Sequence, residues 1–315
     1  MDSSELQKLA EHSRSMKEAG FALLFASAVL ALFLIIPQST PQDAALAVVP
    51  EAIIVPDAYE KTSVEAKAAI VYDLVTGETL YEKNADAQLP LASLTKLLTV
   101  YAALALLSPT TPITIPAEAT RLEAPHAFNA GQIFSLSDLA RLTLTASLND
   151  GAAAIASATA ERANLSQSDM LANAVSGLNL SQTYAVNGSG LDVNTAVSGG
   201  YGSARDLARL AGALVAKDPL IALATTESTT QAKSQGGTAF TVKNTDPVVN
   251  SLPRLLLSKT GYTDLAGGNL ALVFDAGIGH PISVVVLGSS KDARFTDGSA
   301  LVAATLAHFA GVASL

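Results

Sequence analysis

The chain has 315 residues, 49% of them hydrophobic and 15% charged, which is typical of a globular protein rather than a disordered one. Its formal net charge is −9 and no basic patch stands out, which argues against nucleic-acid binding. Cysteine is absent and the four histidines lack ligand spacing, so disulfides and a thiolate nucleophile are excluded and no metal site is expected.

The first predicted element is an apolar helix near the N-terminus. Residues 21–36 are uncharged and almost wholly apolar, and two small residues before them extend the run to 18, the lower limit for a membrane span. Basic residues precede the run, and none follows until Lys61. The positive-inside rule then predicts a cytoplasmic head at residues 1–20 and an extracytoplasmic location after the run. Either an uncleaved signal anchor or a signal peptide cleaved after the small residues at 45–47 fits this pattern.

Two further regions follow this apolar run. Residues 37–63 carry several prolines and are predicted to be a linker, and residues 64–315 are predicted to form the folded domain. The domain opens with a predicted hairpin at 66–85, and residues 93–107 are predicted to form an apolar helix. An irregular stretch with several Pro and Gly residues follows at 110–134.

The middle of the domain is predicted to be helical and its end to be rich in strands. Helical patterns cover residues 136–161, with a break near 147–151, and they cover 166–177 and 203–217. The β-like segments are 239–244, 254–263, 269–277 and 281–289, and the predicted closing helix is 292–310. This order predicts an α/β (α+β) fold, with an antiparallel sheet flanked by helices and a helical subdomain inserted between its strands.

A hydroxyl and an amine lie three residues apart in the predicted helix at 93–107. Ser93 and Lys96 therefore share one face of that helix. A serine needs a neighbouring base to become a nucleophile, and a lysine can be that base when burial and nearby positive charge lower its pKa. This S-x-x-K spacing is common by chance, so on its own it is weak support for catalysis.

Two later motifs strengthen this interpretation. Ser147 and Asn149 have S-x-N spacing at the break between two helices, and Lys259, Thr260 and Gly261 form K-T-G on a predicted strand. The three motifs in this order are the signature of penicillin-binding proteins and class A β-lactamases. The occurrence of all three motifs in this order by chance is improbable.

The chain resembles the serine D-alanyl-D-alanine carboxypeptidases of the penicillin-binding protein type over roughly residues 64–290. The segments around the three motifs are all similar to that family, and so is "NGSGLD" at 187–192. The resemblance implies a serine β-lactamase/DD-peptidase-like fold and a hydrolase that cleaves the terminal D-Ala-D-Ala bond of peptidoglycan stem peptides. It also implies that β-lactams are covalent inhibitors and that no metal or cofactor is needed.

Chemistry and resemblance together suggest a role for each residue on the acylation side of the site. Ser93 would attack the carbonyl carbon between the two D-alanines and form an acyl-enzyme, while Lys96 accepts the proton. Ser147, with Lys259 nearby, would relay a proton to the leaving amine. Asn149 would bind the peptide amide and orient Lys96.

The remaining residues are expected to bind the substrate's carboxylate and its developing oxyanion. Lys259 and Thr260 would hold the terminal carboxylate through a charge and a hydroxyl group. Gly261 would let the strand lie close to the substrate backbone. The backbone N–H groups of Ser93 and Tyr262 would form the oxyanion hole.

Some features depart from the family pattern. Leu148 stands where the carboxypeptidases usually have a glycine, so it is expected to narrow the cleft or shift Asn149. The sequence shows one helix after residue 291, whereas longer members continue into a second domain. This shorter architecture is also that of related DD-endopeptidases, which cut cross-links, and the two activities stay open.

Two other functions, a β-lactamase and a non-catalytic sensor, fit parts of the same sequence pattern. A class A β-lactamase needs a glutamate to activate the deacylating water, and no Asp or Glu lies between Asp169 and Asp192, which leaves Glu161 only if that loop is rearranged. A membrane-attached sensor of cell-wall peptides could keep the pocket without turnover, although no motif residue is missing. Asp150 is expected to cap the following helix rather than to act in catalysis.

Overall fold

The computed structural model describes residues 2–35 and 57–311. These fall into two units, an N-terminal helix and a compact domain. Helix α1 (Ser3–Ile35) contains the predicted apolar segment except for residue 36, which lies outside the described residues, as do residues 37–56 of the predicted linker. In the described parts of the chain, no helix has both the length and the apolar character required to cross a membrane.

A five-stranded antiparallel sheet with the order β10-β11-β12-β1-β2 forms the centre of the domain. Its strands are β1 (Ala68–Asp73), β2 (Thr79–Lys83), β10 (Leu255–Thr263), β11 (Gly267–Asp275) and β12 (Pro281–Ser289). The predicted hairpin and the last three predicted strands are all present. Strand β1 pairs with β12, with Ala68 opposite Leu287, so the two ends of the domain sequence share one sheet as predicted.

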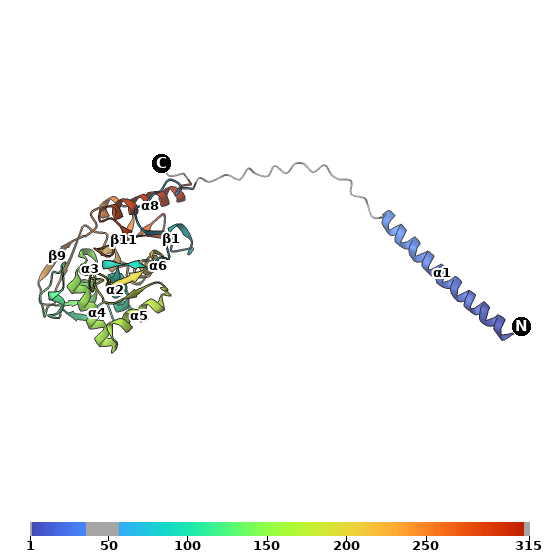
Figure 1. Cartoon of the computed structure of the whole chain (residues 1–315), viewed down its shortest axis with the longest axis horizontal. Helices are drawn as coiled ribbons and strands as arrows, with labels where there is room; N and C mark the ends of the chain where they lie inside the picture. Colours follow the sequence, from blue (N-terminus) through green and yellow to red (C-terminus); the bar gives the residue numbers. More distant parts are fainter. Residues whose placement is uncertain (1, 36–56, 312–315) are drawn as a thin grey trace. The chain divides into compact units, whose positions relative to one another are not determined.

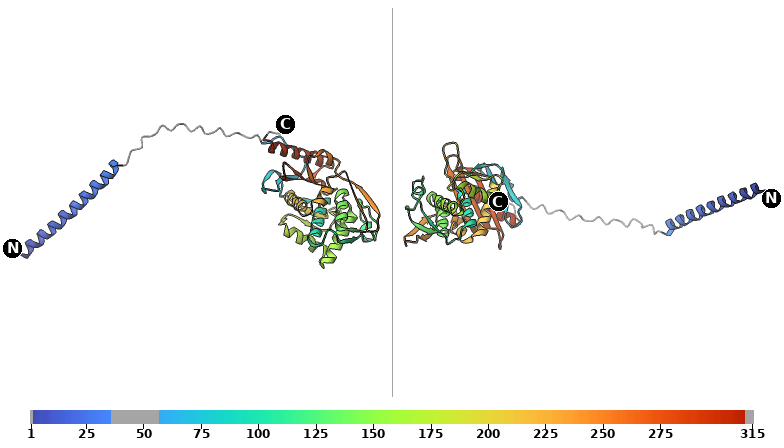
Figure 2. Two further views of the ribbon diagram at one scale, coloured as in Figure 1. Left: turned by 180° about the vertical axis from the view of Figure 1, so that it is seen from behind. Right: turned by 90° about the horizontal axis from the view of Figure 1, so that it is seen from below.

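Both faces of the three inner strands β11, β12 and β1 are buried, which explains why these strands are almost continuously apolar. Alternate side chains of β1, β11 and β12 point to opposite faces. One set packs on α8 (Ala293–Phe309), and the other packs on α6 (Ala204–Lys217) and the helical region beyond it. Figures 1 and 2 show α8 on one side of the strands and the inserted helices on the other.

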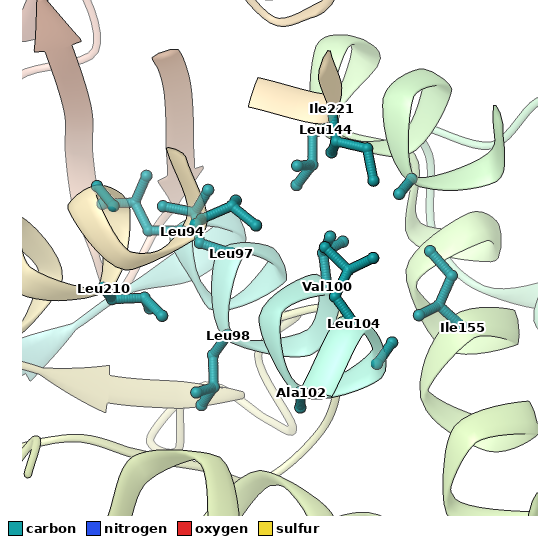
Figure 3. Close-up of a cluster of buried hydrophobic side chains, with 14 of the residues drawn as sticks. Leu94, Leu97, Leu98, Val100, Ala102, Leu104, Leu144, Ile155, Leu210 and Ile221 are labelled. Atoms are coloured by element: carbon teal, nitrogen blue, oxygen red, sulfur yellow. The ribbon is translucent and has the colours of Figure 1, made fainter. Parts of the chain in front are cut away.

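Helix α2 (Thr95–Leu106) runs through the middle of the inserted helical region. Around it lie α3 (Leu136–Ala146), α4 (Asn149–Ala163), α5 (Gln167–Gly177) and α7 (Pro219–Ala224). Figure 3 shows side chains of α2 pointing toward Leu144 of α3, Ile155 of α4, Leu210 of α6 and Ile221 of α7. This packing on several sides fixes the position and rotation of α2, and with them the direction of any functional side chain that α2 carries.

The shorter elements complete the domain and correct two predictions. They are β3 (Leu89–Pro90), β4 (Pro112–Thr114), β5 (Ile133–Ser135), β6 (Tyr184–Ala185), β7 (Gly200–Gly202), β8 (Thr229–Lys233), β9 (Ala239–Lys243) and three 3-10 turns, Ala92–Leu94, Ala119–Arg121 and Val249–Ser251. The predicted strand at 239–244 is β9, but it pairs only with β8 in a separate ribbon. Val242 is its one buried residue, so it lacks the apolar faces that the central sheet requires. The stretch at 110–134 also contains β4 and part of β5.

The domain includes residues before the predicted start at 64. Tyr59 is buried, and its hydroxyl donates to Thr305 Oγ1 of α8 at 3.0 Å. The carboxylate of Asp297 on α8 accepts hydrogen bonds from the backbone N–H groups of Glu65 and Ala66 at 3.0 and 2.9 Å. It also accepts one from Ser289 Oγ at 2.7 Å. This buried acid therefore ties the entry of β1 and the end of β12 to α8.

We expect Asp297→Asn to lower the free energy of unfolding by about 1–3 kcal/mol, because an amide nitrogen would face a backbone donor in place of an acceptor. Urea unfolding of the purified protein measures this difference. Glu227→Gln is the matched control, since Glu227 is exposed, and it should change stability by less than about 0.5 kcal/mol. Equal stabilities of the two variants would contradict the anchoring role.

Candidate active site

Ser93 lies at the start of α2, in the 3-10 turn Ala92–Leu94 that leads into it. Its neighbours Ala92 and Leu94 are fully buried, whereas Ser93 itself is half-buried and can be reached from outside. Ala92 has a φ of +48°, an unusual value for a residue other than glycine. Strain of this kind persists only where the surrounding packing imposes it, and here it presents the hydroxyl of the next residue.

The amine of Lys96 is fully buried and makes three hydrogen bonds. Its Nζ lies 2.8 Å from Ser93 Oγ, 2.8 Å from Asn149 Oδ1 and 2.7 Å from the backbone oxygen of Ser189. Burial lowers the pKa of Lys96 well below its usual value, the nearby charge of Lys259 lowers it further, and Asp150 partly opposes both. All three contacts are to neutral groups, so none of them holds a proton on this amine by forming an ion pair.

The loop at 187–192 supplies the third contact of Lys96. The side-chain oxygen of Asn187 accepts hydrogen bonds from the backbone N–H groups of Ser189 and Gly190 and from Ser189 Oγ. Its Nδ2 donates to the oxygen of Leu191 at 2.9 Å. Asn187 thus shapes the turn that directs the Ser189 carbonyl at Lys96. The sequence predicted a loop here without this role, and the Asn-Gly-Ser-Gly pattern was the available signal.

Ser147 and Asn149 lie at the junction of α3 and α4, where the helical pattern was expected to break. Ser147 ends α3 in the left-handed region, with a φ of +59°, and Asn149 begins α4. Leu148 between them has an ordinary extended backbone and a buried side chain within the apolar core. The expectation that Leu148 narrows the cleft is therefore wrong, because its side chain points into the core.

The side-chain amide of Asn149 is hydrogen-bonded through both its oxygen and its nitrogen. Its Oδ1 accepts from Lys96, and its Nδ2 donates to the backbone oxygen of Glu123 at 2.8 Å, which leaves its second N–H for a substrate carbonyl. The neighbouring Asp150 is not the helix cap that was expected. Its Oδ2 accepts from the backbone N–H groups of Ala127 and Phe128, both at 2.8 Å, so it fastens the preceding loop beside the site.

Lys259 on β10 approaches the site from the opposite side. Its buried Nζ donates to Ser147 Oγ at 2.9 Å and to the backbone oxygen of Thr260 at 2.8 Å. Burial lowers the pKa of Lys259 to about 7, and the positive charge of Arg294 contributes. This lysine and the second serine, 112 residues apart in sequence, are thus in direct contact.

Thr260, Gly261 and Tyr262 continue β10 past the nucleophile. Thr260 Oγ1 lies 2.6 Å from Thr245 Oγ1, and Tyr262 is partly exposed. A Cβ on Gly261 would lie 2.9 Å from the backbone oxygen of Leu91 and 3.3 Å from the backbone N of Ser93. The glycine was expected to make room for the substrate, and its first effect is to let the strand meet the nucleophile's own turn.

Arg294, in the first turn of α8, belongs to this region and was missed by the sequence analysis. Its Nη1 donates to the backbone oxygen of Gly261 at 2.6 Å, and only 7% of its surface is exposed. Burial lowers the pKa of this guanidinium. A single arginine at a helix start carries no recognisable pattern, so only the packing of α8 against the end of β10 brings it here.

This arrangement can carry out acyl transfer to a serine. It has a reachable hydroxyl, a buried amine with a lowered pKa at hydrogen-bond distance, and a second Ser–Lys pair next to them. A fold and site of this kind define a serine peptidase that works through an acyl-enzyme.

Comparison with known proteins agrees with this class. Residues 55–291 match the family model described as D-alanyl-D-alanine carboxypeptidase, and the chain belongs to this family. A D-alanyl-D-alanine endopeptidase of Pseudomonas aeruginosa is 30% identical over 240 residues, which are 74% of this chain and 75% of the relative.

Two solved structures show the same fold. The ampicillin-bound penicillin-binding protein D2 of Listeria monocytogenes is 28% identical, with a TM-score of 0.65, over 77% of this chain and 98% of that one. A D-alanyl-D-alanine carboxypeptidase of Mycobacterium tuberculosis is 23% identical, with a TM-score of 0.66, over 80% of this chain and 96% of that one.

We expect kcat/KM for a peptide ending in D-Ala-D-Ala to fall as the pH rises through about 7, because Lys259 then loses the charge that would bind the carboxylate. The same peptide with a C-terminal amide is the control, and its kcat/KM should fall less over this range, because only the contact of Lys259 with Ser147 then depends on the charge. Lys259→Arg should move the limb to higher pH, because the guanidinium stays charged. A falling limb only near pH 10 in the wild type would contradict a lowered pKa.

Proposed function

We propose that this protein is a serine DD-peptidase that cleaves the bond after the penultimate D-alanine of peptidoglycan stem peptides. The observation that carries the proposal is the buried amine of Lys96 at 2.8 Å from the reachable hydroxyl of Ser93, with no carboxylate among its contacts. Burial lowers the pKa of this amine well below its usual value, which favours the neutral form that can accept the proton of the serine.

Acylation begins with attack by Ser93 and ends with protonation of the leaving amine. Ser93 Oγ forms a bond to the carbonyl carbon while its proton passes to Lys96 Nζ, and the oxyanion is received by the backbone N–H groups of Ser93 and Tyr262. The C–N bond then breaks, and the proton that Lys96 accepted passes through the Ser147 hydroxyl to the leaving amine, which leaves Lys96 neutral again. Lys259 contacts Ser147, so its charge favours a hydroxyl oriented to donate toward the amine.

Substrate binding uses the groups on either side of the nucleophile. Lys259 and Thr260 bind the terminal carboxylate, and the nearby Arg294 adds positive charge behind the strand. The free N–H of Asn149 holds the peptide amide on the other side. Water then attacks the ester and releases the shortened peptide, with no metal or cofactor in any step.

Fast hydrolysis of β-lactams is not expected. Lys96 contacts a serine hydroxyl, an amide oxygen and a backbone carbonyl, so it lacks the carboxylate partner that would activate a deacylating water. Glu161, the acid considered in the sequence, lines a surface cavity with Glu118 and Arg162 and makes no hydrogen bond to Ser93 or Lys96 among the described residues. β-Lactams should therefore acylate Ser93 and stay attached.

Cleavage of cross-links is the second candidate. The 30%-identical relative from Pseudomonas aeruginosa is named an endopeptidase, and it matches most of both chains. The two activities use the same acyl-enzyme and differ only in the leaving group, which is a single D-alanine in one case and a second peptide in the other.

Intact mass after incubation with penicillin, and D-alanine release from a pentapeptide, test the proposal. We expect a stable adduct and D-alanine release with wild type and with the control Ser137→Ala, and neither with Ser93→Ala. An adduct without release of D-alanine would favour the endopeptidase if a cross-linked peptide dimer is cleaved and the sensor if it is not, and rapid loss of the adduct would favour a β-lactamase. No adduct on folded wild-type protein would overturn the proposed chemistry.

We also propose that the domain acts outside the cytoplasm. The support is the apolar run at 21–36, with basic residues before it and none until Lys61, together with the extracytoplasmic location of peptidoglycan. An alkaline phosphatase fused after residue 63 should be active in growing cells, and a fusion lacking residues 1–36 should not. The mass of the mature protein distinguishes a cleaved signal peptide from a retained anchor, and equal activity of the two fusions would contradict export.

A further inference from the structure

A cavity of about 550 Å³ adjoins the carboxylate-binding end of the active site. It lies between the segment that follows β9 and the first turn of α8, and its walls include Lys243, Thr245, Lys291 and Arg294. Thr245 contacts the hydroxyl of Thr260, and Arg294 contacts the carbonyl of Gly261. The cavity therefore begins one side chain beyond the motif that would hold the substrate's carboxylate.

Three cationic and two anionic side chains line this cavity, so it has a small excess of positive charge on a chain whose net charge is −9. Lys243, Lys291 and Arg294 line it, together with Asp246 and Asp292. Asp246 is buried, and its two oxygens already accept hydrogen bonds from Val248 N and Ser258 Oγ at 2.9 and 2.6 Å. Asp292 is exposed at the start of α8, so it screens the cations only weakly.

The two lysines of the cavity form no ion pair in the described chain, whereas the charges of Asp246 and Asp292 act on Arg294 and partly oppose the lowering of its pKa by burial. Lys243 and Lys291 are exposed and form no ion pair within the described residues, and Lys291 Nζ lies 5.3 Å from the centre of the Tyr262 ring. Arg294 is 7% exposed, and its Nε has no hydrogen-bond partner in the described chain. A buried guanidinium with an unpaired N–H, beside two free ammonium groups, is an unfinished anion site.

We propose that this cavity binds the leaving half of the substrate and selects leaving residues that carry a second carboxylate. The proposal rests on the DD-peptidase function above. When the carboxylate next to the scissile bond is held by Lys259 and Thr260, the side chain of the leaving residue lies beside Thr245 and Arg294. An acidic side chain or peptide branch would then reach Lys243 and Lys291, whereas a methyl group would leave the cavity empty.

Two synthetic peptides that differ only in the leaving residue test this. One ends in D-Ala-D-2-aminoadipate and the other in D-Ala-D-norleucine, which has a similar length and no charge. The ratio of their kcat/KM values isolates the second carboxylate, because both peptides share the acyl part and the α-carboxylate. We expect wild type to prefer the aminoadipate peptide by about tenfold at low salt, as two exposed charge pairs would give.

Charge reversal identifies the residues responsible. Lys243→Glu combined with Lys291→Glu should bring the ratio to one or below, while the matched control Lys233→Glu, an exposed lysine on β8 outside the cavity, should keep it near the wild-type value. High salt should reduce the wild-type preference. Wild type that prefers norleucine, or a preference unchanged in the double variant, would overturn the proposal.

The penicillin adduct distinguishes failure of the peptidase chemistry from failure of the leaving-group site. Absence of the penicillin adduct on Ser93 would reject the peptidase chemistry itself. An adduct on wild type, with equal cleavage of both peptides, would retain the peptidase and reject the anionic leaving-group site.

Discussion

The buried amine of Lys96 is the interaction on which the rest of the site depends. Placing a lysine amine in a protein interior is costly unless each of its donors is satisfied. Here a serine hydroxyl one helical turn away, an amide 53 residues away and a carbonyl 93 residues away surround it. Three segments must therefore converge on one nitrogen, and the resulting burial lowers its pKa, as the proposed role of a base for Ser93 requires.

The local backbone shows the cost of this convergence. Ala92 and Ser147 both adopt positive φ values beside or at reactive hydroxyls, which side-chain-bearing residues seldom do. Gly261 removes the Cβ that would separate β10 from the turn carrying Ser93. The packing of α2 against its neighbouring helices, visible in Figure 3, supplies the rigidity that holds these unusual conformations in place.

The central sheet brings residues from the two ends of the domain sequence into one site. Strands from both ends of the domain pair in it, so β10 carries Lys259 to the second serine of the helical region. The contact of α8 with the same strand adds Arg294 and opens the cavity lined by Lys243 and Lys291. The residues proposed for acylation and for leaving-group recognition thus lie along a single edge strand, β10.

The sequence by itself determined the elements with strong patterns and the three motifs. The apolar runs of β1, β11 and β12, the helical patterns and the S-x-x-K spacing are local, so their physical meaning can be inferred from neighbouring residues. The order of the motifs also indicated the family. A sheet shared by the N-terminal hairpin and the last strands was predictable because strand patterns occur at both ends of the domain sequence, with helical patterns between them.

Only the tertiary structure decided what depends on contacts between distant residues. Leu148 could point into the cleft or into the core, and its burial against neighbouring helices decided the outcome. β9 has a strand pattern, yet its exposed faces exclude it from the central sheet. Ser189 contributes a backbone carbonyl, and Arg294 acts through a single long-range hydrogen bond. Neither role can be recognised in the sequence, because backbone groups are common to all residues and an isolated arginine has no periodicity.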